Sequence, residues 1–383
     1  MHYFDHAAST RIPAFVEKAM SEAYDQYGNV HRGIHRNSVV TTDLYETARA
    51  KVASFINAAS SEIAFTHGTT EGINLVARGL EHRIGALDNI IVTEMEHHSN
   101  LAPWQALATR TGAKLKVVAI NRSDLLDLDD LRDKINSHTK IVAFPSVSNV
   151  LGTVLPVSTI VNIAREVGAL TLVDAAQSVA HTPTDVRAWN ADFVVFSGHK
   201  MYAPTGIGAL FSNQFWMLKP TFFGGGMVHE ATSDNHCYAI DNRMFECGTP
   251  PIIQAIGLGA ATDYIRFEEG WHQIQAQEKR ITEYAYNCLE EWGAKIIGPS
   301  LGKRGPLISF NIDGIHPHDV ASILDEYSVA VRAGHHCAQP LHEKLGLKAS
   351  VRASFNFNNR KWEVDKMMAA LNNVQKLFQR RDA

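Results

Sequence analysis

The sequence has 383 residues, of which 45% are hydrophobic and 20% charged, with a formal net charge of −4. This length suggests two or three domains, and the composition excludes extended disorder. The slightly acidic balance argues against a dedicated nucleic-acid binder. No apolar run reaches the roughly 18 residues of a membrane span, and no secretory signal is recognised. The four cysteines form no disulfide framework, so we expect a cytoplasmic protein.

The first 260 residues divide into a short N-terminal segment and a long segment in which strand and helix patterns alternate. We expect residues 1–20 to associate with a smaller domain or to lie across the main one. Residues 21–260 alternate short apolar runs with helical patterns, which predicts a mostly parallel sheet covered by helices on both faces. The carboxyl ends of such strands share one rim, where ligands bind. The predicted strands are 63–66, 89–93, 115–120, 141–144, 170–173 and 193–196, and the predicted helices are 72–80, 101–111 and 157–167.

The pattern changes after about residue 260. Residues 258–292 predict a long helix with a break near Gly270. The remaining elements, which alternate between strand and helix, predict a smaller α+β domain over residues 261–383. They are strands at 307–312, 329–332 and 351–355 and helices at 317–327 and 363–378.

The strongest local motif surrounds Lys200, which follows the predicted strand 193–196 in a Gly-containing turn. A single turn lysine is usually a solvated surface residue. Asp174, however, ends the strand 170–173 on the same rim. This pair suits pyridoxal 5′-phosphate (PLP), because a lysine forms the Schiff base and a carboxylate keeps the pyridine nitrogen protonated. Asp174 is also a typical helix cap, which Gln177 would complete, so both interpretations stay open.

A phosphate site is indicated by residues 65–72, which have the pattern of a strand, a Gly/Thr turn and a helix start. Backbone N–H groups and the hydroxyls of Thr69 and Thr70 can bind an anion there. A plain helix cap explains the same residues equally well. Ser197 and His199, which flank the lysine turn, are further candidate phosphate donors.

Polar residues also follow two other predicted strands. His97, after strand 89–93, can stack on an aromatic ring or carry protons. The neighbouring pair His97 and His98 indicates a metal site only weakly, because adjacent side chains diverge. Asn149, beyond strand 141–144, can bind a cofactor or substrate, or can belong to an ordinary turn.

A second strong motif surrounds Cys337, which lies beside His335 and His336 in a polar, Gly-rich segment. This context favours a reactive thiol over a buried, inert cysteine. The three side chains are too closely spaced for a tetrahedral site, and no metal is predicted. Arg332 and Arg352 can bind an amino-acid carboxylate through two parallel hydrogen bonds, although a salt bridge is an equally open interpretation for each.

Together these segments resemble the aminotransferase class V family of PLP enzymes, and specifically its group II, SufS-like cysteine desulfurases. The Gly-Thr-Thr-Glu turn alone is a weak signal, whereas the motifs around Lys200 and Cys337 in one chain are highly specific. The matching motifs follow the family order over nearly the whole chain. They are Tyr3-Phe4-Asp5-His6-Ala7-Ala8, Val30-His31-Arg32-Gly33-Ile34-His35, Gly68-Thr69-Thr70-Glu71-Gly72-Ile73-Asn74, Glu96-His97-His98, Val173-Asp174-Ala175-Ala176-Gln177, Ser197-Gly198-His199-Lys200, Phe245-Glu246-Cys247-Gly248-Thr249-Pro250, Arg332-Ala333-Gly334-His335-His336-Cys337-Ala338 and Val351-Arg352-Ala353-Ser354.

The resemblance implies a fold-type I homodimer with its active site at the dimer interface and a seven-stranded, mostly parallel sheet in the large domain. It implies that Lys200 binds PLP, that Cys337 accepts sulfur and that His97 takes part in catalysis. Its implied cofactor contacts are Thr69, Thr70, His97, Asn149, Asp174, Gln177, Ser197, His199, Lys200 and, from the other subunit, Gly248 and Thr249. Its implied substrate contacts are Arg352, Asn149, Arg332 and His31.

The activity that the resemblance implies converts L-cysteine to L-alanine through PLP aldimine and ketimine intermediates. The persulfide left on Cys337 would pass to a SufE- or SufU-like acceptor, in iron–sulfur cluster assembly or other sulfur trafficking. His318 is a candidate contact for a zinc-containing acceptor, although a histidine at a helix start is ordinary. Selenocysteine lyase and cysteine sulfinate desulfinase are the alternatives among PLP enzymes, and a non-catalytic zinc- or persulfide-binding protein is the alternative outside them. His6, Cys247 and residues 227–242 depart from the family pattern.

Overall fold

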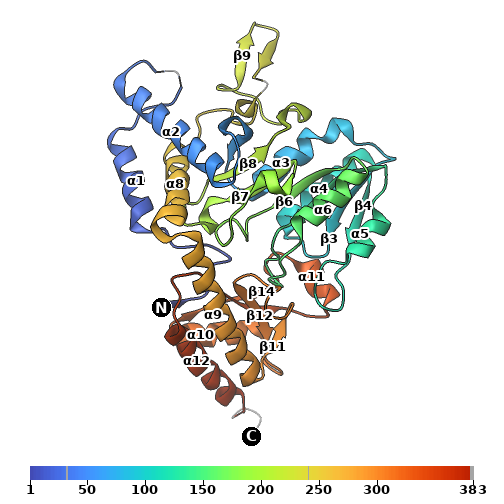
Figure 1. Ribbon diagram of the computed structural model, residues 1–383, viewed down its shortest axis with the longest axis vertical. Helices are drawn as coiled ribbons and strands as arrows, with labels where there is room; N and C mark the ends of the chain where they lie inside the picture. Colours follow the sequence, from blue (N-terminus) through green and yellow to red (C-terminus); the bar gives the residue numbers. More distant parts are fainter. Residues whose placement is uncertain (32, 240, 380–383) are drawn as a thin grey trace.

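A computed structural model describes residues 1–31, 33–239 and 241–379 (Figure 1). Its centre is a seven-stranded sheet in the order β2-β8-β7-β6-β5-β3-β4. Six of these strands run in the same direction, and β8 runs in the opposite one. The strands are β2 (Ile63–Thr66), β3 (Asn89–Thr93), β4 (Lys114–Val118), β5 (Thr139–Pro145), β6 (Leu170–Asp174), β7 (Phe193–Ser197) and β8 (Gly208–Ser212). The predicted α/β class and mostly parallel sheet are confirmed.

Helices cover both faces of this sheet because its strands are apolar on both sides. In β3, Ile91 belongs to one buried cluster and Ile90 and Val92 to the other. One face is covered by α2 (Arg36–Phe55), α6 (Val157–Glu166) and α8 (Ile252–Asp263), and the other by α3 (Thr69–Gly79) and α4 (Ala102–Thr111). The remaining helices of this part are α1 (Ala14–Asp25), which packs against α8, α5 (Leu128–Lys134) and α7 (Val186–Trp189).

A second, smaller sheet carries the C-terminal part of the chain, below the large sheet in Figure 1. It is antiparallel and has its own apolar core, to which Phe310 and Val351 contribute. Its strands, in spatial order, are β11 (Lys295–Ile297), β12 (Leu307–Asn311), β15 (Ser350–Ser354) and β14 (Arg332–Gly334). The helices around it are α9 (Trp271–Trp292), α10 (Pro317–Glu326), α11 (Gln339–Lys344) and α12 (Lys361–Gln379).

The predicted break in the long helix near Gly270 is confirmed. α8 continues into a π-helical turn at Tyr264–Glu269, and Gly270 then takes a φ of 78° before α9 begins. A positive φ is adopted readily by glycine, which has no Cβ atom. The chain can therefore change direction at this residue, between the part that carries the large sheet and the part that carries the small one.

The predicted single strand at 329–332 is wrong. Val329–Ala330 (β13) pairs with His2–Tyr3 (β1), whereas β14 joins the small sheet. The two halves pair with different partners, and Val331 between them belongs to neither strand. The N-terminal segment thus runs beside the C-terminal part of the chain, while the division into units at residues 20 and 260 stays a prediction.

A two-stranded hairpin of β9 (Val228–Ala231) and β10 (His236–Tyr238) projects from the large sheet at the top of Figure 1. It lies within residues 227–242, the segment that departs from the family pattern. Within the described ranges, no helix has the length and apolar character required to cross a membrane.

Candidate active site

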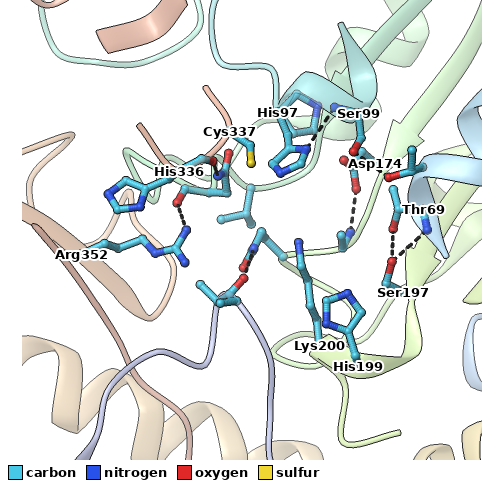
Figure 2. Close-up of a pocket in the computed structure, with 18 of the residues that line it drawn as sticks. Thr69, His97, Ser99, Asp174, Ser197, His199, Lys200, His336, Cys337 and Arg352 are labelled. Atoms are coloured by element: carbon cyan, nitrogen blue, oxygen red, sulfur yellow. Dashed lines mark hydrogen bonds between the residues drawn. The ribbon is translucent and has the colours of Figure 1, made fainter. Parts of the chain in front are cut away.

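A cavity of about 290 Å³ lies at the carboxyl ends of the large-sheet strands, facing the small sheet. Lys200 enters it from the 3-10 turn Gly198–Lys200, which directly follows β7, and Asp174 is the last residue of β6. The cavity brings together most of the residues that the sequence singles out, as Figure 2 shows. Those lining it are Thr69, Thr70, His97, Asn149, Asp174, Gln177, Ser197, His199, Lys200, Arg332, Cys337 and Arg352.

The Lys200 amine makes no hydrogen bond or ion pair with any residue of the described ranges, and it points into the cavity (Figure 2). Burial lowers the pKa of Lys200, with Asp174 acting in the opposite direction. Burial likewise raises the pKa of Asp174, although Lys200 and the Ala176 N–H, which donates to Oδ1 at 2.9 Å, both favour the charged carboxylate. A nucleophilic amine and a buried carboxylate therefore face one another across open space.

The amino end of α3 and the end of β7 form a polar cradle. The Thr69 N–H donates to Ser197 Oγ at 2.8 Å, and the two hydroxyls are also 2.8 Å apart. Gly68, with a φ of 151°, keeps the turn close, because a Cβ atom there would lie 3.1 Å from Ser197 Oγ. Thr70 Oγ1 is 2.7 Å from Ser99 Oγ. Hydroxyls around a helix amino terminus form a site for an anion such as a phosphate.

His97 presents a neutral ring to the cavity. Its Nδ1 accepts from the Ser99 N–H at 3.1 Å, which places the remaining ring proton on Nε2. Burial, reinforced by the positive charge of Lys200, lowers the pKa of His97 to about 4. Gln177 is oriented by its amide, which donates from Nε2 to the Ala7 carbonyl at 2.8 Å. An uncharged, flat ring beside the amine suits stacking on an aromatic cofactor.

The opposite end of the cavity carries the exposed thiol of Cys337. We call residues 335–338, between β14 and α11, the Cys337 loop. His336 and Cys337 have φ values of 52° and 57°, a conformation that residues with side chains rarely adopt. The ring of His336 turns away from the thiol (Figure 2). It bonds through Nε2 to Ser350, and burial lowers the pKa of His336 to about 2.

Asp5 was not assigned a role from the sequence, although it anchors both arginines. Its carboxylate accepts from Arg332 at 2.8 Å and from Arg352 at 3.4 Å. Arg352 is only 3% exposed, also donates from Nη1 to the Asn149 carbonyl at 2.9 Å, and has no partner for Nε among the residues described. Burial lowers the pKa of Arg352 to about 10. A buried, oriented guanidinium with a free donor fits a carboxylate ligand.

Three predicted site residues, His31, Gly248 and Thr249, do not line this cavity. His31 instead bonds Glu46 Oε1 at 2.8 Å, and the Gly248 N–H donates to the Gly225 carbonyl at 2.6 Å. Arg32, which follows His31 in its motif, lies outside the described residues. Within one copy of the chain, the cavity is therefore lined without the segments that carry these three residues.

Comparison with known proteins establishes the class. A model of the aminotransferase class-V family matches residues 2–367, and the chain belongs to that family. A probable cysteine desulfurase of Streptomyces coelicolor is 46% identical over 98% of this chain and 92% of its own length, and a cysteine desulfurase of Haloferax volcanii is 44% identical over 98% and 90%. The solved apo structure of the cysteine desulfurase from Thermococcus onnurineus NA1 superposes with a TM-score of 0.95 at 42% identity, covering 98% of this chain and 94% of that one.

This family consists of PLP-dependent enzymes, so the predicted cofactor, fold type and enzymatic character are confirmed. The cavity fits the cofactor on its own evidence, since it combines a free lysine amine, a buried carboxylate, a neutral ring and a polar cradle. Among the residues that the structure describes, no group of three or more His, Cys, Asp or Glu side chains could hold a metal ion.

Proposed function

We propose that this protein is a cysteine desulfurase that converts L-cysteine to L-alanine and retains the sulfur on Cys337. The observation that carries the proposal is the presence of the Cys337 thiol and the Lys200 amine in the lining of one cavity. The relatives that bear this name support it, because they match nearly the full chain. A selenocysteine lyase or a cysteine sulfinate desulfinase would use much the same residues.

The cofactor end of the cavity would hold and orient PLP. Lys200 would bind the cofactor covalently, and the Asp174 carboxylate would pair with the pyridine nitrogen. His97 would stack on the ring, and Gln177 would bond the phenolic oxygen. The cradle of Thr69, Thr70, Ser197 and His199 would bind the phosphate. The bound cofactor supplies an electron sink for the substrate α-carbon.

The substrate end positions L-cysteine and takes up its sulfur. Arg352 binds the substrate carboxylate, with Asn149 and Arg332 beside it. The Lys200 amine removes the α-proton and later returns a proton. The Cys337 thiolate attacks the substrate sulfur, so that an S–S bond forms while the carbon–sulfur bond breaks. The electron pair of the broken bond stays on the substrate, which takes up protons and leaves as L-alanine.

A second copy of the chain completes the site in this proposal. His31, Gly248 and Thr249 lie outside the cavity of their own chain, and a homodimer would bring them to the cavity of the other copy, Gly248 and Thr249 toward the phosphate and His31 toward the substrate. Glu246, just before this turn, accepts from Arg49 Nη2 at 2.8 Å and from the Phe65 N–H at 2.6 Å. That buried ion pair fixes the turn for presentation to a partner.

The persulfide is passed on to a SufE- or SufU-like acceptor protein, in iron–sulfur cluster assembly or other sulfur trafficking in the cytoplasm. His318 supports docking beside the thiol. It is exposed at the start of α10, and its Nε2 lies 3.7 Å from where a Cβ atom on Gly334 would be, at the entry to the Cys337 loop. In a pull-down with a zinc-loaded acceptor, the His318→Ala variant should be captured more weakly than the parent protein. Equal capture of the variant and the parent would reject this docking site.

The test of the function is alanine formed from L-cysteine by the PLP-loaded protein, with and without a thiol reductant. We expect continued turnover with reductant and about one equivalent of alanine per site without it, because the persulfide then stays on the enzyme. Cys337→Ala should keep its bound cofactor and lose turnover, and unchanged turnover would refute the assignment of the nucleophile. Bound PLP without alanine would direct the same assay to selenocysteine and cysteine sulfinate.

A further inference from the structure

Two adjacent histidines after β3 contact different parts of the molecule. His97 lines the cavity, whereas His98 lies outside it and contacts the Cys337 loop. The His98 N–H donates to the Cys337 carbonyl at 2.7 Å, and its ring Nε2 accepts from the Gln339 N–H at 3.2 Å. His98 thus bonds Cys337 within the loop and Gln339 at the start of α11, directly after the loop.

The Cys337 loop needs such contacts because its backbone is strained. Two consecutive residues with side chains, His336 and Cys337, occupy the left-handed region, which costs roughly 1 kcal/mol or more for each. A strained conformation persists only where its surroundings determine it. The His336 carbonyl accepts from Asn149 Nδ2 at 2.7 Å, and the Cys337 carbonyl accepts from the main chain of His98. The structure therefore holds two successive carbonyls of the loop from outside.

The His98 ring adds a contact that the main chain cannot supply. Gln339 is the first residue of α11, and the first N–H groups of a helix have no partner within it. His98 Nε2 satisfies this donor, which requires a neutral ring with its proton on Nδ1. Both residues are exposed, so the contact is separate from the apolar core. It links the segment after β3 to the first residue of α11, directly after the Cys337 loop.

We propose that His98 is a positioning residue for the nucleophile, and that its ring fixes the Cys337 loop, with the thiol facing the cavity, by accepting the Gln339 amide proton. Its effect on turnover rests on the proposed desulfurase function, whereas its effect on the loop does not. His98 makes no contact with substrate or cofactor in this role, and it acts only through the loop.

Two substitutions in the PLP-loaded enzyme separate the acceptor from the bulk of the ring. His98→Phe keeps a flat ring without an acceptor, and His98→Gln restores an acceptor oxygen at similar reach. We expect His98→Phe to slow the first turnover to alanine about fivefold, and to speed amide exchange in peptides covering residues 335–345 by a similar factor, as for the loss of one hydrogen bond. His98→Gln should stay within about twofold of the parent in both measurements. His138→Phe, at an exposed histidine just before the amino end of β5 and outside the cavity lining, is the matched control.

The absorbance of bound PLP distinguishes an effect on the Cys337 loop from a general disturbance of the site, because only the latter would change it. It should be the same in all variants, because His97 stays in place. The inference is overturned if His98→Phe equals the parent, if His98→Gln fails as much as His98→Phe, or if the cofactor absorbance shifts together with the loss. A parent enzyme that forms no alanine would refute the proposed function, and the inference would then be decided by the amide exchange alone.

Discussion

The two ends of the cavity are built in different ways. The cofactor end is assembled at the carboxyl ends of neighbouring strands of one sheet, as Asp174 ends β6 and Lys200 lies in the turn after β7. The thiol end is assembled from segments far apart in the chain, since Asp5 bonds Arg352 across 347 positions and Asn149 bonds His336 across 187. Sheet topology determines the first end, whereas contacts between the two parts of the chain determine the second.

Because of this difference, we expect substitutions at the two ends to impair the enzyme in two distinguishable ways. Substitutions at the cofactor end should remove the cofactor signal and turnover together. Substitutions at the thiol end should leave the cofactor bound and change how the substrate is held or attacked. Substitutions at each end test that separation.

The largest effect is expected for Lys200→Ala. Without this amine there is neither a covalent link to the cofactor nor a group to move the α-proton, so alanine formation should fall about a thousandfold or more. The absorbance of the lysine-bound cofactor should disappear in the same variant. Lys114→Ala, at an exposed lysine at the start of β4, is the control and should match the parent. Persistence of the absorbance in Lys200→Ala would mean that another lysine binds the cofactor.

A smaller and more selective effect is expected for Asp5→Asn. The charged partner of Arg332 and Arg352 is lost, and the guanidinium of Arg352 loses part of its orientation. Steady-state kinetics should show KM for L-cysteine rising about tenfold with a smaller change in kcat, as for the loss of charge-assisted hydrogen bonds. Asp263→Asn removes a carboxylate that pairs with Lys51 away from the cavity, and it should change neither constant. A large loss of bound cofactor in Asp5→Asn would contradict the separation of the two ends.

The smallest effect on activity is expected for His6, on the segment that touches both ends through its neighbours Asp5 and Ala7. Burial, together with the charge of His181, lowers the pKa of His6 to about 3. The fold therefore favours the neutral ring. The stability that it contributes is complete above the unfolded pKa near 6.5 and is lost as the pH falls toward 3.

His6→Asn should remove this pH-dependent contribution to the free energy of unfolding. Between pH 7 and pH 4.5, the free energy of unfolding should then fall by about 2 kcal/mol less than in the parent, as measured by urea unfolding at both values. His138→Asn, at an exposed position, should follow the parent. An identical fall in His6→Asn and the parent would show that other groups cause the acid sensitivity.

Much of the fold could be predicted because its signals are local. The strands at 63–66 and 89–93 have the predicted bounds, since short apolar runs define buried strands by themselves. The segment 329–332 could not be predicted, because its division depends on pairing with His2 and Tyr3 at the other end of the chain.

The site follows the same rule. Lys200, Asp174 and Ser197 stand at strand ends, where the sequence pattern already places them on one rim. Asp5 and His98 lie in motifs that can be recognised in the sequence, but their partners Arg332 and Gln339 are 327 and 241 positions away. No local pattern shows such contacts. A pairwise contact prediction that joined Asp5 to the arginines would have found the first of them.

The pairing of β1 with β13 has a consequence for biosynthesis. A ribosome adds roughly 5–20 residues per second, so His2 leaves the exit tunnel tens of seconds before Val329, its partner in the sheet, is made. Throughout that interval the nascent chain can form much of the large sheet but has no counterpart for Asp5. Arg332, Arg352 and the Cys337 thiol join the pocket only when translation is nearly finished. An incomplete chain is therefore unable to begin the proposed sulfur transfer.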